Sequence, residues 1–109
     1  MAEVIKILAQ ADVTASLADL YTVPAATSTV ISSIVIANRS AVTRTFTLKV
    51  APAGVADAAQ HHLYAAVQLT KNNTFVATLG MTLAATDKLR VLADAASALS
   101  VTVFGTEYT

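Results

Sequence analysis

The feature that most constrains the fold is a period-two alternation of apolar and polar side chains, rich in β-branched residues, that recurs along the chain. Between residues 42 and 50, Val42, Phe46, Leu48 and Val50 share one side of an extended segment with Arg44. Threonine is the commonest residue on the other side. Since successive side chains of a strand point to opposite faces, the pattern predicts a half-buried strand with a threonine-lined solvent face.

Further segments of this kind predict short strands around Ile5 and at residues 20–23, 29–37, 63–70, 75–79, 88–92 and 99–104. In the fourth of them, Leu63, Ala65, Val67 and Leu69 are expected on one face. The stretch 29–37 is apolar on both sides, which is typical of a central strand covered on both faces. Turn residues separate the segments at 24–25, 38–40, 52–54, 71–73, 80, 86–87 and 94–96. We therefore expect an all-β chain, a single jelly-roll-like β-sandwich of about seven or eight short antiparallel strands.

The 109 residues suit one domain, with a β-sandwich over residues 19–109 and an N-terminal strand or arm over residues 1–18. Four apolar residues, Val4, Ile5, Ile7 and Leu8, begin this N-terminal segment, and a less patterned Ala/Thr/Ser stretch follows them. Two interpretations stay open. The segment is either an arm that reaches an adjacent subunit or an ordinary first strand followed by a long loop.

The charge balance excludes some functions and favours association. Seven Lys and Arg cancel seven Asp and Glu, so no excess of positive charge exists to neutralise the phosphates of a nucleic acid. Hydrophobic residues make up 55% of the chain, and low net charge removes the repulsion that keeps monomers apart. No apolar run approaches the roughly 20 residues that cross a bilayer, and the first residues do not resemble a signal peptide. We expect a chain made in a cytoplasm, with no membrane and no nucleic acid among its partners.

The sequence shows no catalytic constellation. His61 and His62 are adjacent, so on a strand their rings would face opposite sides and would rarely reach one metal ion. The absence of cysteine excludes disulfides and Cys-based zinc sites, and the three glycines are isolated rather than gathered in a phosphate-binding loop. We expect no enzymatic activity, no metal and no cofactor.

The candidate interface residues are large apolar, aromatic or arginine side chains in the N-terminal segment, in the predicted strands and near their ends. Arg44 lies on the apolar side of its strand, where it either rests its stem on the core at a sheet end or bridges to a neighbouring subunit. The three tyrosines are either interface anchors or ordinary part-buried strand residues. The full set of interface candidates is Val4, Ile5, Ile7, Leu8, Tyr21, Arg39, Arg44, Tyr64 and Tyr108.

Nearly the whole chain from about Ile5 onward resembles a family of small virion structural proteins of tailed bacteriophages. The resemblance rests on the order and spacing of strand and turn patterns, each of them unspecific by itself. These are LYTVPAAT at 20–27, VISSIVIANRS at 30–40, VAPAG at 50–54, HLY at 62–64, NTF at 73–75, LGMTLAATD at 79–87 and VFGTE at 103–107.

The resemblance implies a one-domain β-sandwich built into a phage particle, with no catalytic residues to transfer. It favours a capsid decoration (cement) protein, a dimer or trimer that binds the major capsid protein or other virion proteins and clamps neighbouring capsid subunits. The expected location is the virion, assembled in the host cytoplasm. Two alternatives stay open: a tail, neck or baseplate/fibre component, and a host-surface or glycan-binding module.

Overall fold

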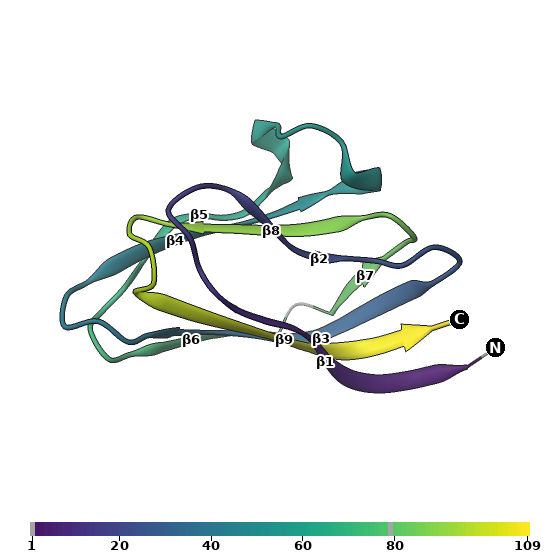
Figure 1. Ribbon diagram of the computed structural model, residues 1–109, viewed down its shortest axis with the longest axis horizontal. Coiled ribbons are helices and arrows are strands. Elements are labelled where there is room, and N and C mark those ends of the chain that lie inside the picture. Colours follow the sequence, from purple (N-terminus) through teal and green to yellow (C-terminus); the bar gives the residue numbers. More distant parts are fainter. Residues whose placement is uncertain (1, 79) are drawn as a thin grey trace.

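A computed structural model describes residues 2–78 and 80–109, and in this part of the chain nine strands form two facing antiparallel sheets (Figure 1). The strands are β1 (Glu3–Asp12), β2 (Ala18–Thr22), β3 (Ser28–Asn38), β4 (Arg44–Ala51), β5 (His62–Leu69), β6 (Thr74–Ala77), β7 (Met81–Leu83), β8 (Lys88–Ala93) and β9 (Leu99–Tyr108). Two 3-10 turns, η1 (Pro52–Gly54) and η2 (Ala59–His61), lie between β4 and β5. No helix in the described residues is long and apolar enough to cross a membrane.

The strand order is that of one long hairpin rolled up on itself. Its rungs are the antiparallel pairs β1–β9, β2–β8, β3 with β6 and β7, and β4–β5. Rolling brings β9 against β3 and β8 against β4, which gives sheet A (β1-β9-β3-β6, with β7 also on β3) and sheet B (β2-β8-β4-β5). This arrangement is a jelly roll. The expected all-β sandwich is confirmed, with nine strands where seven or eight were expected.

The core lies between the inner faces of the two sheets. Each of the two alternating segments 88–92 and 99–104 sends its predicted face inward, where Leu89, Leu99, Val101 and Val103 are fully buried and Val91 is nearly so. On the side of the core next to the edge strands β5 and β6, three aromatic rings pack together from both sheets. The centroid of Phe46 lies 4.8 Å from that of Phe75 and 6.3 Å from that of Tyr64, within the range of favourable ring packing.

Strand β5 departs from the predicted alternation. A bulge at Ala66, whose φ is +46°, inserts an extra residue, and the backbone N–H of Ala66 donates to Thr47 Oγ1 at 3.0 Å. The core side of β5 is therefore carried by Tyr64, Val67 and Leu69. The predicted inward position of Leu63 is wrong because the bulge reverses the phase of the strand. In the predicted strand 75–79, Phe75 and Ala77 pair with β3, and Leu79 lies outside the described residues.

Strand β1 belongs to sheet A of its own chain. It pairs with β9 along its whole length, with a bulge between Ile7 and Ala9, and Val13 just after it is fully buried. The chain thus forms an ordinary first strand, and the five-residue connection 13–17 leads to β2. Exchange of this strand between copies stays a prediction.

Candidate interaction surfaces

The outer face of sheet B is covered by its own chain. Residues 52–61, which include both 3-10 turns, fold over β4 and β8, and we call this side the closed face (Figure 1). Thr47, Lys49 and Ala51 point outward from β4, yet Lys49 is only 7% exposed and Ala51 is fully buried. The predicted threonine-lined solvent face is therefore wrong at Thr47, because the connection that follows β4 folds back over this part of the strand.

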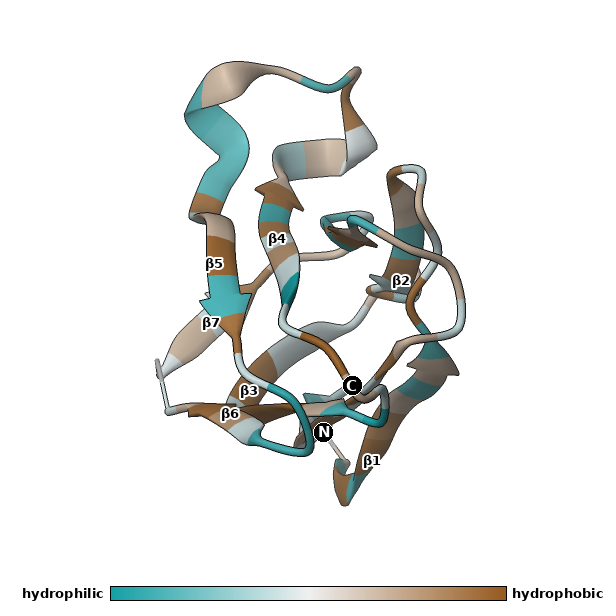
Figure 2. Cartoon of the chain, turned by 90° about the vertical axis from the view of Figure 1, so that its left-hand side faces the viewer, coloured by the Kyte–Doolittle hydropathy of each residue, from teal (hydrophilic) through white to brown (hydrophobic). Residues whose placement is uncertain are grey.

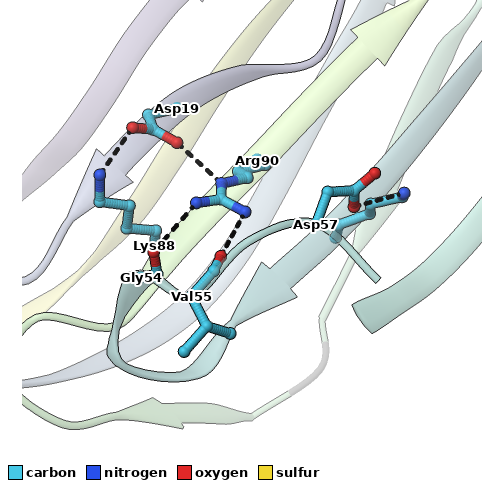
Figure 3. Close-up of polar contacts among 7 residues, drawn as sticks. Asp19, Gly54, Val55, Asp57, Lys88 and Arg90 are labelled. Atoms are coloured by element: carbon cyan, nitrogen blue, oxygen red, sulfur yellow. Dashed lines mark hydrogen bonds and ion pairs between the residues drawn. The ribbon is translucent and has the colours of Figure 1, made fainter. Parts of the chain in front are cut away.

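Charged side chains fasten this cover to the sheet (Figure 3). The guanidinium of Arg90 donates to the carbonyl oxygens of Val55 at 2.9 Å and Gly54 at 3.3 Å, and its Nε donates to Asp19 at 2.8 Å. Lys88 Nζ donates to the second oxygen of Asp19, also at 2.8 Å. These two hydrogen bonds lower the pKa of Asp19 below its ordinary value of 3.8. The closed face therefore satisfies its own charges.

A second anchor lies further along the same cover. Lys49 Nζ donates to Asp57 Oδ1 at 2.7 Å, which lowers the pKa of that carboxyl below its ordinary value. His61 is buried at the end of the cover and its Nδ1 has no hydrogen-bond partner, whereas His62 is exposed with its Nδ1 2.8 Å from the carbonyl oxygen of Ala59. The two histidines thus differ in environment, as expected for adjacent residues. Among residues 2–78 and 80–109, no group of three or more His, Asp or Glu side chains could hold a metal ion.

The outer face of sheet A carries exposed apolar side chains interspersed with threonine and serine, and no described segment covers it. We call it the open face; its apolar side chains, from β1, β9, β3 and β6, are Ile5, Ile7, Val30, Val35, Val76 and Phe104. Ile7 lies opposite Phe104, and Val35 opposite Val76. Ile5 is 79% exposed and Val76 58%. Figure 2 shows the brown, hydrophobic stretches on β1 and β6.

The open face corrects one sequence-based expectation. Strand β3 is central in its sheet, as predicted, and Ile34 and Ile36 are fully buried in the core. Its other face is only half-buried at Val30 and Val35 and exposed at Ser32. The prediction that β3 is covered on both faces is therefore wrong for the single chain, which covers only the core side of this strand. Large apolar side chains that remain exposed together on one uncovered sheet face favour an interaction site there.

A polar rim borders the open face at one end. Arg39 forms an ion pair with Asp12 and donates to the carbonyl oxygen of Ser97 at 3.1 Å. Here the surface has a shallow depression of about 410 Å³, lined by Gln10, Ala11, Asp12, Arg39, Ser100 and Thr102.

At the opposite end, a buried polar bridge joins the two sheets. The hydroxyl of Tyr21, on β2, donates to Glu107 on β9 and lies 2.9 Å from Thr29 Oγ1 on β3. Lys6, on β1, reaches the other oxygen of Glu107 at 2.8 Å. Burial, and then the hydrogen bond to the Glu107 carboxylate, raises the pKa of Tyr21 to about 12. The hydrogen bonds from Lys6 and Tyr21 lower the pKa of Glu107.

The sequence-based interface candidates on β1 fall into two groups. Val4, Ile5 and Ile7 are exposed on one edge strand of the sandwich. Leu8 is half-buried at the bulge, and a Cβ at Gly105 would lie 2.8 Å from its Cδ1, so Leu8 packs onto the glycine of β9.

The remaining candidates are dispersed. Tyr21 is buried in the bridge and Tyr64 packs in the aromatic cluster, while Tyr108 lies half-exposed on the last strand. Arg39 lies on the polar rim, and Arg44 lies at a sheet end 4.0 Å from Asp94. Phe104 and Val76 are exposed on the open face but are absent from the sequence-based interface candidates. The signal was present, because Phe104 falls on the polar side of an alternating strand.

No protein-family model and no curated protein sequence matches this chain. Among solved structures, a chain from the disulfide-linked pili of Bacillus endospore appendages is 14% identical, with a TM-score of 0.56 over 99% of this chain and 85% of that one. A chain from the structure of infectious bursal disease virus, Gx strain, is 15% identical, with a TM-score of 0.55 over 97% of this chain. This protein spans about a third (32%) of that viral chain. At these identities the likeness shows a shared fold.

Proposed function

We propose that this protein is a non-enzymatic structural component of a virus particle, a capsid decoration (cement) protein that binds and stabilises neighbouring capsid subunits. The observation that carries the proposal is the open face, where large apolar side chains stay exposed and no described segment covers them, while residues 52–61 cover the opposite face. A monomer with no partner gains nothing from such a surface, which favours aggregation. A subunit of an assembly buries it.

The fold comparison supports an assembling role. The two chains described above come from a pilus and a virus, and each match covers nearly all of this chain. The pili are described as disulfide-linked, whereas this chain has no cysteine. Contacts made by this protein are therefore non-covalent on this proposal. The phage assignment itself rests on the sequence resemblance.

The mechanism is the addition of many modest contacts. Each copy would bury open-face residues against a capsid surface, gaining roughly 25 cal/mol per Å² of apolar area before the costs of association. The partners are the major capsid protein or other virion proteins, together with further copies of this chain in a dimer or trimer. The protein would reach the virion after synthesis in the host cytoplasm, without binding nucleic acid or membrane.

The test is the position and copy number of the chain in purified particles. Quantitative mass spectrometry should give a copy number in proportion to the major capsid protein, and image reconstruction should place the chain on the capsid lattice. A small copy number confined to one end of the particle would instead assign it to the tail, neck or baseplate.

A binding assay separates the two faces. Particles stripped of this protein should rebind the wild type and a closed-face variant, Lys88→Met, but not the open-face variant Phe104→Glu. Phe104 is partly exposed and packs beside Ile7, so a carboxylate there places a charge in the contact without entering the core. Equal binding of both variants would contradict the proposal.

One observation favours a second candidate, a host-surface or glycan-binding module. The shallow polar depression at Arg39 offers guanidinium, carboxylate, amide and hydroxyl groups, which are the groups that hydrogen-bond sugars. A glycan array is the direct test. A specific hit that Arg39→Ala abolishes would support this candidate over capsid decoration, and an empty array would remove it.

A further inference from the structure

We propose that the free edge of β1 pairs antiparallel with β1 of a second copy around a two-fold axis, so that the two copies of sheet A form one continuous sheet. The inference deepens the homo-oligomer part of the proposed function. Its experiment uses the isolated chain, so it can fail while the capsid role stands.

Strand β1 differs from the other edge strands. It is ten residues long, whereas β2 has five, β6 four and β7 three. Strand β5, the remaining edge of sheet B, is interrupted by two register shifts against β4. Short and bulged edges are the usual protection against pairing with another chain. Only β1, among the described edge strands, combines length with exposed isoleucines.

The backbone of β1 has free hydrogen-bonding groups in a regular array. Ala2 and Thr109 exchange both of their N–H···O=C bonds, at 2.9 and 2.8 Å. Because such pairs alternate along antiparallel strands, Val4 and Lys6 also turn their peptide groups toward β9. The peptide groups of the intervening residues Glu3, Ile5 and Ile7 then face the open edge. A strand with an open edge is self-complementary to a two-fold copy of itself.

The bulge and the charges select a register. The regular edge ends at Ile7, where the bulge begins. Centring the two-fold axis on Ile5 pairs it with Ile5 of the second copy and pairs Glu3 with Ile7 in both directions, so every free peptide group in the segment is used. This register sets Lys6 opposite Val4 of the second copy, whereas centring on Lys6 would oppose two like charges.

The side chains fit a second copy as the occupant. Ile5, the most exposed large apolar side chain of the described residues, would meet its own equivalent on the open face. Lys6 already has its charge paired with Glu107, and the chain has zero net charge, so two copies approach without repulsion. The pairing would also join two open faces side by side into one larger apolar surface.

The experiment is the mass in solution, measured by light scattering over a range of concentrations, for the wild type and two proline variants. Ile5→Pro removes an outward-facing N–H from β1 and leaves the bonds to β9 intact. The matched control is Val76→Pro. Val76 lies on the same outer face, on the edge strand β6. Asn38 N–H donates to the carbonyl oxygen of Asn73 at 2.9 Å. Because hydrogen-bonded and non-hydrogen-bonded pairs alternate along β3 and β6, the N–H of Val76 points away from β3, toward the free edge of β6.

The wild type should dimerise, Ile5→Pro should dissociate at least about tenfold more readily because two symmetry-related hydrogen bonds are lost, and Val76→Pro should behave as the wild type. A wild type that is monomeric at every concentration overturns the proposal. So does a dimer that Ile5→Pro leaves unchanged.

A cross-linking experiment covers the case in which a proline variant fails to fold. The chain has no cysteine, so Ile5→Cys and Val76→Cys each introduce a single thiol on an exposed strand position. Directly opposed residues of a hydrogen-bonded pair have Cα atoms about 5.5 Å apart, within the range that a disulfide spans. Mild oxidation of dilute protein should cross-link Ile5→Cys into dimers and leave Val76→Cys monomeric. Equal cross-linking of both variants contradicts the pairing.

Discussion

The two sheets of this sandwich treat their outer faces in opposite ways. On sheet B, Arg90 and Lys49 lie under a cover made by residues 52–61, and Asp19 and Asp57 pair with their charges. On sheet A, isoleucine, valine and phenylalanine side chains remain exposed, and none of the described segments covers them. The longest connection in the described part of the chain, residues 52–61, lies over the polar face. The chain therefore contains a segment long enough to cover one sheet face, and this segment lies on sheet B rather than on sheet A.

The largest expected effect tests whether the two sides of β3 really differ. Ile36→Ala, on the core side, should lower the free energy of unfolding by about 2–5 kcal/mol, because it leaves a cavity at a fully buried site. Val35→Ala, next to it on the open face, should cost less than about 1 kcal/mol. Urea denaturation measures both. Equal losses would mean that the open face is covered.

The next effect concerns the closed face. Arg90→Met keeps an unbranched apolar stem but removes the guanidinium and its bonds to Asp19, Gly54 and Val55, and should cost about 2–3 kcal/mol of unfolding free energy. The matched control, Lys88→Met, removes only the bond to Asp19 and should cost less than about 1 kcal/mol. Faster amide exchange over residues 52–61 should accompany the first variant only. Similar losses in both variants would show that the cover is not held by Arg90.

The bridge between the sheets gives an intermediate effect at alkaline pH. Tyr21→Phe should cost about 1–1.5 kcal/mol near pH 8, because it removes the hydroxyl that bonds Glu107 and Thr29. In the folded protein the pKa of Tyr21 is raised from 10.0 to about 12. The stability it contributes is therefore complete below pH 10 and is lost as the pH rises toward 12.

Thermal unfolding between pH 8 and 12 measures this dependence, with Tyr108→Phe as the control for a half-exposed tyrosine. The control should keep the alkaline loss and Tyr21→Phe should reduce it. If stability fell by the same amount at alkaline pH in both variants, ionisation of Tyr21 would not be its cause.

A smaller effect is expected at acidic pH. The pKa values of Asp19, Asp57 and Glu107 are all lowered by their basic or hydroxyl partners. Their contribution is present above the ordinary values of 3.8 and 4.5 and is lost as the pH falls through the depressed ones. Stability should thus decline below about pH 4.5. Lys49→Met removes the partner of Asp57 and should flatten this decline slightly; a steeper decline would contradict the assignment.

The smallest effect on stability is expected on the open face. Ile7→Thr should change the free energy of unfolding by no more than about 0.5 kcal/mol, because the side chain is already 54% exposed. The same variant should raise solubility and weaken association. A loss of stability above about 1 kcal/mol would show that Ile7 packs within its own chain.

Much of this architecture follows from local patterns. The sides of β8 and β9 that face the core were predictable. The alternation in both strands is uninterrupted, so only one choice of inward side buries Leu89 and Val101. The turns were predictable for a similar reason. Gly54, Asn72 and Gly80 adopt positive φ at three of the predicted turn positions, which few residues tolerate.

What was not predictable depends on contacts between distant residues. The bulge at Ala66 has no sequence signature, since alanine rarely adopts positive φ, and it is supported by Thr47 on another strand. The cover over sheet B depends on Arg90, 35 positions from Val55. The bridge of Tyr21, Glu107 and Lys6 joins three strands that only the rolled hairpin brings together.

The central claim is that the chain covers its own polar face and leaves β1 and the open face for partners. Residue-resolved hydrogen–deuterium exchange of the wild type tests it most directly. The exchange is measured at a protein concentration too low for association and at one high enough for it. The outward amides of Ile5 and Ile7 should become protected on association, while residues 52–61 keep the same exchange rates. Protection that arises over residues 52–61 and leaves β1 unchanged would contradict the account.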